Sequence, residues 1–272
     1  LKILLSCSKL LKPLLPSKLK AQVPTLKKTL AWPDDDLPRS MILHQGCIQP
    51  LLAPETNQVT AEVFSKLGIK CMPEKNNYCC GALHYHSGKT QKALQIIRNN
   101  IDAWLPQLDK GAECIVSTAS GRGWFIKDYK NLLKDDPAYA QKALQISLKC
   151  KDVAEVMLAE KTDKLEINQK NLVAYHAPCS LQHGQKASGQ VEKLLADKGL
   201  QLLIPEDPHL CCGSAGTYSL YNPGTASKLQ KNKLNNLMAL SPEIIVTANV
   251  GCQLHLGKNS RVKIVHWIEL FR

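Results

Sequence analysis

The sequence of 272 residues is poor in aromatic side chains, which make up 5% of it, and it has no long uncharged hydrophobic run. A helix that crosses a bilayer needs about 20 consecutive apolar residues, so the sequence predicts that the chain is not an integral membrane protein. It also lacks G-x-G-x-x-G, P-loop and His-Glu-x-x-His motifs and a Ser-His-Asp order. Since the first two motifs build nucleotide sites, the chain shows no apparatus of its own for binding a flavin or a nucleotide.

Acidic residues are missing from the start of the chain. The formal charge is +12, and residues 1–33 contribute seven lysines and no acid. We interpret residues 1–38 as a basic leader, which is either solvated or in contact with anionic lipid or an acidic partner subunit. Nucleic acid is not expected as a partner, because no aromatic side chains are interleaved with the lysines to stack on bases. The composition as a whole, 44% hydrophobic and 21% charged, is that of a globular protein.

Cysteine, by contrast, is abundant. The chain has 11 cysteines, and this odd number excludes complete disulfide pairing within it. Two pairs are adjacent and followed by glycine, at 79–81 and 211–213. Vicinal cysteines rarely bond to one another, and disulfide scaffolds are typical of much smaller secreted chains. We therefore expect a reducing, cytoplasmic compartment and thiolates that bind a metal.

An internal repeat organises these cysteines. Residues 44–81 and 176–213 both read His-x2-Cys, then 31 residues, then Cys-Cys-Gly, at an offset of 132. Further on the offset becomes 130, and 113–122 aligns with 243–252. Arg122 therefore stands where the second half has a cysteine. A repeat of this kind indicates a duplicated structural unit.

Strands and helices alternate in both halves of the repeat. This order predicts an α/β fold of two tandem, duplicated parallel-sheet domains, at 39–165 and 166–272. In such sheets, sites form beyond the carboxyl ends of the strands. Residues 137–164 are expected to be mostly helical. Strands are predicted at 41–43, 69–72, 114–118, 171–175, 200–204 and 243–247, and helices at 59–67, 89–108, 191–198 and 226–240.

The second half holds a complete set of four thiols from three loops: Cys179, Cys211, Cys212 and Cys252. Thiolates are soft ligands for zinc, copper(I) or iron–sulfur clusters. Zinc usually takes its ligands from C-x2-4-C knuckles, and none is present here. Adjacent cysteines reach different irons of a cluster more easily than one small ion, so an iron–sulfur cluster is favoured. Gly213 is expected to let the backbone approach inorganic sulfide. Four buried structural cysteines are the alternative.

The first half offers an incomplete set: Cys47, Cys79 and Cys80, with Arg122 in the fourth position. Arginine is permanently charged and is not expected to ligate iron. Three outcomes stay open, namely a missing cluster with Arg122 in its place, a fourth ligand from elsewhere such as Cys114 or Cys71, and a three-thiol cluster with an open iron. We favour absence or lability.

Several histidines and cysteines are secondary candidates. His44 and His176 precede the first cysteine of each half and either tune a cluster by hydrogen bonding or are core residues. His84 and His86 have a possible metal or proton role if the segment is extended. The remaining unpaired cysteines are interpreted as structural: Cys7, Cys71 and Cys150.

These motifs resemble a known family, the cysteine-rich CCG domains shared by heterodisulfide reductase (its B subunit), anaerobic glycerol-3-phosphate dehydrogenase (its C subunit) and lactate-utilisation proteins. Within it, the chain is most similar to iron–sulfur subunits of glycolate oxidase, over nearly all of 40–272. The segments that carry the resemblance are 46–50 (GCIQP), 79–86 (CCGALHYH), 99–104 (NNIDAW), 210–218 (LCCGSAGTY) and 245–253 (IVTANVGCQ).

The resemblance implies an electron-transfer subunit with a cluster of the 4Fe-4S type. A separate flavin-containing subunit oxidises glycolate to glyoxylate, and electrons pass through the iron–sulfur subunit toward the membrane quinone pool. It also implies a cytoplasmic protein, peripheral on the inner face of the membrane. Full-length members carry an N-terminal ferredoxin-like region, so a chain that starts at Leu1 is expected to begin inside a longer protein. The family's first half ends Ser-Gly-Cys-Gly, whereas this chain has Arg122 there, which puts the first cluster in doubt.

Two rival functions follow from the same residues. One is thiol–disulfide chemistry at an open iron, as in heterodisulfide reductase. The other is an interaction module stabilised by zinc.

Overall fold

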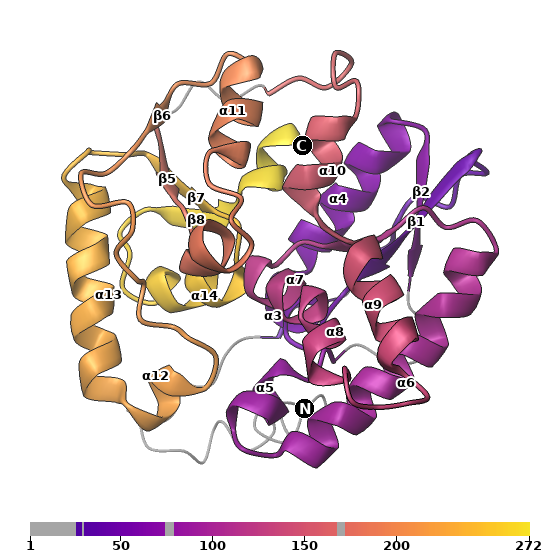
Figure 1. Cartoon of the computed structure of the whole chain (residues 1–272). Coiled ribbons are helices and arrows are strands. Elements are labelled where there is room, and N and C mark those ends of the chain that lie inside the picture. The colour runs from indigo at the N-terminus through magenta and orange to yellow at the C-terminus, as the bar shows by residue number, and fades with distance from the viewer. Residues whose placement is uncertain (1–25, 29, 74–78, 168–171) are drawn as a thin grey trace.

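Two four-stranded parallel sheets form the framework of the protein (Figure 1). The computed structural model describes residues 26–28, 30–73, 79–167 and 172–272. The first sheet has the order β2 (Ile69–Pro73), β1 (Arg39–His44), β3 (Ile115–Ser117), β4 (Cys150–Asp152). The second has the order β6 (Leu202–Leu203), β5 (Val173–His176), β7 (Ile244–Thr247), β8 (Lys263–His266). The predicted fold class, two duplicated parallel-sheet α/β units, is confirmed. The domain boundaries at 39–165 and 166–272 stay predictions.

The central strands are buried on both faces, as parallel strands between helices must be. Ile42 and Ile115 lie opposite one another in neighbouring strands, and both are 0% exposed. In the second sheet, Ala174 pairs with Ile245, and these are also 0% exposed. The apolar, β-branched runs therefore form strands because each side chain they carry is removed from water.

Helices connect the strands, and the long ones lie close to their predicted ranges. The predicted helix at 89–108 is α6 (Thr90–Asp109), and the one at 226–240 is α13 (Pro223–Met238). The other helices of the first half are α3 (Gln49–Leu52), α4 (Pro54–Lys66), α5 (Ala82–His86), α7 (Ser120–Lys127), α8 (Tyr129–Leu132), α9 (Ala140–Lys149) and α10 (Val153–Ala159). The second half has a π-helix, η2 (Ser180–Gly184), then α11 (Gln190–Asp197), α12 (Tyr218–Tyr221), α14 (Val250–Gly257) and a 3-10 helix, η3 (Trp267–Phe271).

The fourth strand of each sheet was not predicted from the sequence. Residues 137–164 are mostly helical as expected, but Cys150–Asp152 between α9 and α10 forms β4. This strand has only three residues, and its middle residue is exposed. A segment so short shows no period of two, and its pairing with β3 decides its conformation. For the same reason, β8 near the end of the chain is recognised only through its pairing with β7.

The two halves exchange their last helices. α10 follows β4 of the first sheet but packs on α11 of the second half, and η3 follows β8 but packs on α4 of the first half. The side chains of these four helices join in one core, which contains Met157 and Leu194 from one contact and Phe64 and Trp267 from the other. Since this core draws on both halves, we expect them to unfold together.

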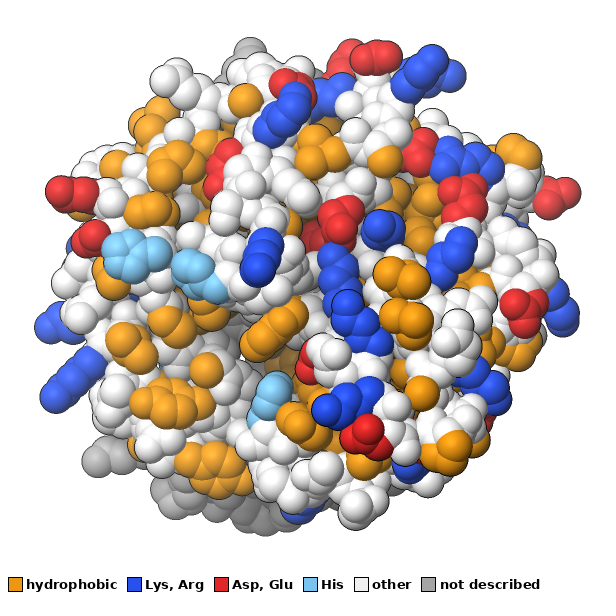
Figure 2. Space-filling model, viewed as in Figure 1, with side chains coloured by type: hydrophobic (Ala, Val, Ile, Leu, Met, Phe, Trp, Pro, Cys, Tyr) orange, Lys and Arg blue, Asp and Glu red, His pale blue; other side chains and the backbone are white. Residues whose placement is uncertain are grey.

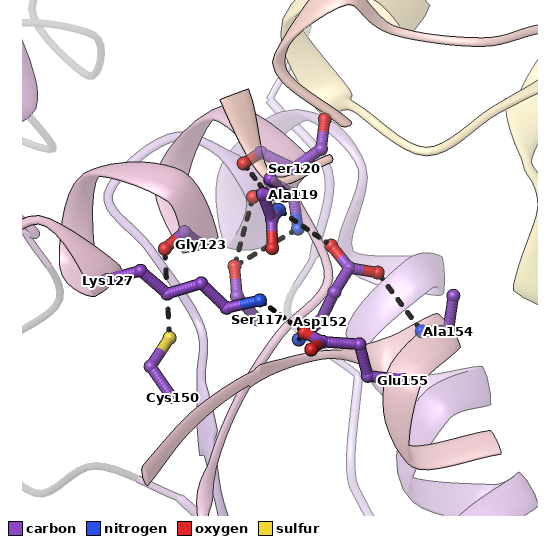
Figure 3. Close-up of polar contacts among 10 residues, drawn as sticks. Ser117, Ala119, Ser120, Gly123, Lys127, Cys150, Asp152, Ala154 and Glu155 are labelled. Carbon is purple, nitrogen blue, oxygen red and sulfur yellow. Dashed lines mark hydrogen bonds and ion pairs between the residues drawn. The ribbon is translucent and has the colours of Figure 1, made fainter. Parts of the chain in front are cut away.

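Equivalent residues begin the two exchanged helices. Asp152 ends β4 and caps α10, and His266 ends β8 and caps η3, each in a capping box with the glutamate three residues later. Figure 3 shows the Asp152 site, where one carboxylate oxygen accepts from the N–H of Ala154 at 3.0 Å. The other accepts from Nε2 of Gln185, in the second half, at 3.2 Å. Complete burial raises the pKa of Asp152 to about 6, because it disfavours the charged form.

The buried carboxyl group gives a testable pH dependence. A carboxyl whose pKa is raised on folding stabilises the fold below pH 4, and this contribution is lost as the pH rises through 6. Asp152→Asn caps the helix but does not titrate. Between pH 4 and pH 7, the free energy of unfolding measured in urea should therefore fall by about 3 kcal/mol more for wild type than for the variant. A difference that is constant across this range would contradict the expectation.

The surface of the described part of the chain carries mixed charges. Figure 2 shows basic and acidic side chains interspersed with apolar ones over one face. Most of the predicted basic leader, at 1–25, lies outside the described residues. No helix in the described ranges is both long enough and apolar enough to cross a membrane.

Candidate metal centre

The cysteines of the repeat lie in loops beyond the carboxyl ends of the strands. Cys47 comes three residues after β1, and Cys179 three residues after β5. Cys252 lies in the first turn of α14, directly after β7. The Cys-Cys-Gly segments follow β2 and β6. Because neighbouring parallel strands end at one edge, each half gathers its cysteines there.

The second cysteine set, defined as Cys179, Cys211, Cys212 and Cys252, forms a chain of contacting thiols. The Cys212 thiol donates to Sγ of Cys252 at 3.0 Å, and this lowers the pKa of Cys252 to about 5. Hydrogen bonding with Cys179 likewise lowers the pKa of Cys211. The N–H of Gly213 donates to Sγ of Cys211 at 3.3 Å. The four thiols that the sequence groups together therefore lie together in the fold.

This set runs from the surface into the core. Cys179 is exposed and Cys211 half-buried, whereas Cys212 and Cys252 are each 3% exposed. Desolvation opposes ionisation of both inner thiols. The hydrogen bond from Cys212 offsets this at Cys252, whereas hydrogen bonding with Cys211 and Cys252 raises the pKa of Cys212 further. A group held here has one side open to a partner and one side shielded from water.

His176 lies against the inner thiols. It is 1% exposed, and one of its ring nitrogens lies within 4.8 Å of Sγ of both Cys212 and Cys252. Within the described residues neither ring nitrogen makes a hydrogen bond of normal geometry, although the ring is close enough to help lower the pKa of Cys252. Its counterpart His44 packs edge-on against Trp104, with 5.2 Å between ring centroids. The two histidines that the sequence could not distinguish therefore differ, since only His176 joins a group of possible metal ligands.

The donor set of the second half fits a thiolate-bound metal or cluster. Four sulfurs converge from three loops, and soft ligands of this kind suit iron–sulfur clusters and zinc. Buried polar atoms without partners are rare in proteins and call for a ligand or ion. The ring of His176 supplies such atoms beside the sulfurs.

Gln182 and Lys233 tie the loops of the second set together. Nε2 of Gln182 donates to the carbonyl of Ala177 at 2.8 Å and to that of Pro208 at 3.2 Å. Nζ of Lys233 donates to the same Pro208 carbonyl at 3.1 Å. The segments that lead to Cys179 and into Cys211 thus share partners, which holds their thiols in place.

Sequence reasoning missed Lys233. It lies on the predicted helix, between buried residues at Gln230 and Leu237, and it is 0% exposed. Burial lowers its pKa, while negative charge on Cys212 and other groups of this region acts in the opposite direction. The sequence does carry a signal for this residue, because a lysine stands on the apolar face of the predicted amphipathic helix.

Gly213 has a packing role that differs from the expected one. Its φ is +86°, and a Cβ there would lie 2.6 Å from the carbonyl oxygen of Ala226 in α13. The loop packs so closely against this helix that only glycine fits at position 213. This packing explains the glycine without any approach of the backbone to inorganic sulfide.

A pair of glycine variants tests this packing. Gly199 also has a positive φ, +77°, but a Cβ there would meet nothing within 4 Å. Gly199→Ala should therefore cost only the backbone strain, about 1 kcal/mol. Gly213→Ala adds a clash with backbone and should cost about 2–4 kcal/mol of unfolding free energy. Equal losses in denaturant titrations of the two variants would contradict this assignment.

The first cysteine set, defined as Cys47, Cys79 and Cys80, repeats part of this arrangement. Hydrogen bonding with Cys47 lowers the pKa of Cys79 to about 6. The N–H of Gly81 donates to Sγ of Cys79 at 3.4 Å, as that of Gly213 does to Cys211. Three thiols thus meet in the first half, in the predicted positions.

Arg122 occupies the fourth position of the first set and is fully engaged there. Its guanidinium donates to the carbonyl of Gln45 at 2.9 Å, to Oγ1 of Thr118 at 3.1 Å and to Oγ of Ser117 at 3.2 Å. A Cβ on Gly46, whose φ is +77°, would lie 1.9 Å from Nη1 of Arg122. The guanidinium therefore replaces a thiol and braces the Cys47 loop against the end of β3.

The other candidate residues lie apart from both sets. Cys71 and Cys114 are buried in the core near β2 and β3, and Cys114 lies at the amino end of its strand, away from the site edge. Cys150 is buried, and its thiol is directed at the carbonyl of Gly123, 3.8 Å away. His84 and His86 are in α5, not in an extended segment. Cys7 lies outside the described residues.

The helix that holds Arg122 meets the loops of the second set at the contact between the halves. The N–H of Ser120, two residues before Arg122, donates to the carbonyl of Ala248 at 3.0 Å. Its hydroxyl is 2.8 Å from that of Ser180, the neighbour of Cys179. The segments that hold Arg122, Cys179 and Cys252 are therefore in direct contact.

Known proteins are similar to this chain over most of its length. A model of the family described as "Cysteine-rich domain", CCG, matches residues 41–127 and 173–257. The glycolate oxidase iron–sulfur subunit of Escherichia coli (strain K12) is 46% identical over 96% of this chain and 64% of its own length. The probable glycolate oxidase iron–sulfur subunit of Bacillus subtilis (strain 168) is 29% identical over 83% of this chain and 52% of its own length. Lactate utilization protein A of Oceanobacillus iheyensis is 26% identical over 82% of this chain and 93% of its own length. The chain thus spans between half and two thirds of the two glycolate oxidase subunits.

Proposed function

Because the chain belongs to the family of cysteine-rich CCG domain proteins, we propose that it is an iron–sulfur subunit of a glycolate oxidase. In this proposal Cys179, Cys211, Cys212 and Cys252 bind one iron–sulfur cluster of the 4Fe-4S type. Such a cluster supplies one-electron transfer at a potential that ligands, hydrogen bonds and charge set. The observation that carries the proposal is the convergence of these four sulfurs, with the Cys212 and Cys252 sulfurs 3.0 Å apart.

The first cysteine set is proposed to hold no cluster. Its fourth position is the guanidinium of Arg122, which cannot act as a ligand and which already donates to Gln45, Ser117 and Thr118. In this proposal the second set alone carries electrons.

The route of the electrons is part of the proposal. A flavin-containing subunit would oxidise glycolate to glyoxylate, and this chain would pass the electrons toward the membrane quinone pool. The similarity to glycolate oxidase iron–sulfur subunits supports membership of an oxidase complex. Cys179, the exposed member of the second set, supports this face as the point where electrons enter or leave the cluster. We propose a cytoplasmic location, peripheral on the inner face of the membrane.

Anaerobic reconstitution with iron and sulfide tests the cofactor. The expected result is one cluster per chain, measured by iron, sulfide and zinc analysis and by EPR of the reduced protein. Stoichiometric zinc without iron would overturn the proposal in favour of a zinc-stabilised interaction module. Disulfide reduction by the chain without a flavin partner would favour the heterodisulfide-reductase-like rival.

Co-purification tests the partner. A tagged chain should retain a flavin-containing subunit from an extract of its own source, and added glycolate should then reduce the cluster. Failure of glycolate to reduce the cluster in a complex that contains the flavin would count against the substrate.

A further inference from the structure

A fully buried lysine lies beside the second cysteine set, and its ammonium has no carboxylate hydrogen bond within the described part of the chain. Lys233 is 0% exposed, and its Nζ donates to the carbonyls of Asp207 at 3.0 Å and Pro208 at 3.1 Å. Lysine is almost never fully buried unless it is paired, because taking an ammonium group out of water costs several kcal/mol. Two neutral carbonyls position this group but do not balance its charge.

The groups whose negative charge acts on this ammonium are thiols of the second set and the carboxylate of Asp207, which is exposed. The carbonyls that Lys233 binds belong to the loop that leads into Cys211 and Cys212. Among the charges that act on its ammonium are those of Cys212 and Cys252, which are both buried. Charges in a shielded site interact far more strongly than in water. Lys233 is thus placed to act on whatever negative charge these sulfurs carry.

The first half has a neutral residue at the equivalent position. Gly81 packs on the carbonyl of Ala93 in α6 as Gly213 packs on that of Ala226 in α13, so the two helices align at an offset of 133. By this alignment Lys233 corresponds to Asn100.

Asn100 holds the loop of the first half by neutral contacts. It is 0% exposed, and its Nδ2 donates to the carbonyl of Cys79 at 2.9 Å. Both residues therefore bind the loop that carries the adjacent cysteines, but only the half with four thiols has a cation at this position of the helix. Loop positioning alone does not require the charge, since an amide does it in the first half.

We propose that Lys233 is the internal counter-cation of the second cysteine set and raises the reduction potential of the cluster bound there. This inference rests on the proposed function, since it requires a cluster. A thiolate-ligated cluster is an anion, and its reduced form carries one more negative charge. A fixed cation in the same shielded site favours the reduced form and so makes the potential more positive. Lys233 is a positioning and tuning residue, because it touches the loop and not the sulfurs.

Redox titration followed by EPR tests the proposal on the reconstituted full chain. Lys233→Met removes the charge and keeps most of the volume. Its cluster should be harder to reduce, with the ratio of reduced to oxidised cluster at a fixed potential falling at least tenfold, which is 59 mV for a one-electron couple. Lys233→Arg keeps the charge and should restore most of the wild-type potential. Lys231→Met removes an exposed lysine from the same helix and should leave the potential unchanged.

The outcomes separate a charge effect from a structural one. Lys233→Gln keeps a donor for the carbonyls without the charge, so it covers the case in which the methionine variant does not fold. A purely structural role predicts lower cluster content in these variants but an unchanged potential in the cluster that forms, and that result overturns the inference. A wild-type chain that binds no cluster overturns the proposed function, and the inference with it.

Discussion

Replacement of Cys252 by alanine is expected to abolish iron binding by the reconstituted chain. Cys252 is 3% exposed and its sulfur lies 3.0 Å from that of Cys212, so its loss removes the innermost ligand of the second set. The remaining sulfurs belong to two loops only, and no other described cysteine lies at this edge of the second sheet. With the first set empty, iron per chain should fall from one cluster to near zero.

A second buried cysteine provides the matched control for this loss. Cys150 is 1% exposed and lies outside both sets. Cys150→Ala makes a comparable cavity, so any fall in stability is similar in the two variants. It should keep the full iron and sulfide content. Retention of a complete cluster by Cys252→Ala would remove this residue from the ligand set.

Conversion of Arg122 to cysteine should double the iron content. Arg122 aligns with Cys252, and each lies in the first turn of the helix that follows the third strand of its half. Substitution removes the guanidinium from the Cys47 loop and provides the missing fourth thiol beside Cys47, Cys79 and Cys80. Reconstitution should then give two clusters per chain, measured by iron and sulfide analysis.

The serine variant separates the added thiol from the lost guanidinium. Arg122→Ser vacates the same space without a soft ligand, so its iron content should equal that of wild type. Both variants lose the three hydrogen bonds of the guanidinium, and any shared loss of stability comes from these. If Arg122→Cys binds no more iron than Arg122→Ser, the missing thiol is not the reason why the first set holds no cluster.

The repeat explains why so much of the site was predictable. The spacing from His-x2-Cys to Cys-Cys-Gly recurs in both halves, and strands of a parallel sheet end at one edge. Together these two facts place seven cysteines in two groups before any tertiary contact is known. They also identify Arg122 as the departure in the first group.

Features without a sequence period were not predictable. β4 has three residues and β8 four, so only pairing with neighbouring strands reveals them. The exchange of α10 and η3 between the halves likewise leaves no mark in the repeat, because the buried apolar residues of each helix do not show in the sequence which half they cover. This exchange nevertheless joins the halves into one core.

Equivalent positions in the repeat also diverge in ways that only packing reveals. His44 and His176 have the same sequence context, yet one packs on Trp104 and the other lies beside Cys212 and Cys252. Lys233 reads as one of several lysines on a helix until its burial is known. Such differences depend on which side chains from distant segments fill the adjacent space.

By itself, then, the sequence determined the duplicated α/β architecture, the two cysteine sets and the substitution at Arg122, because each rests on local pattern and spacing. The tertiary structure decided what these residues face: the four sulfurs in contact, the histidine with unpartnered nitrogens and the buried ammonium of Lys233. The physical reason is that burial and charge balance arise from contacts between segments far apart in the chain. No spacing along the chain encodes them.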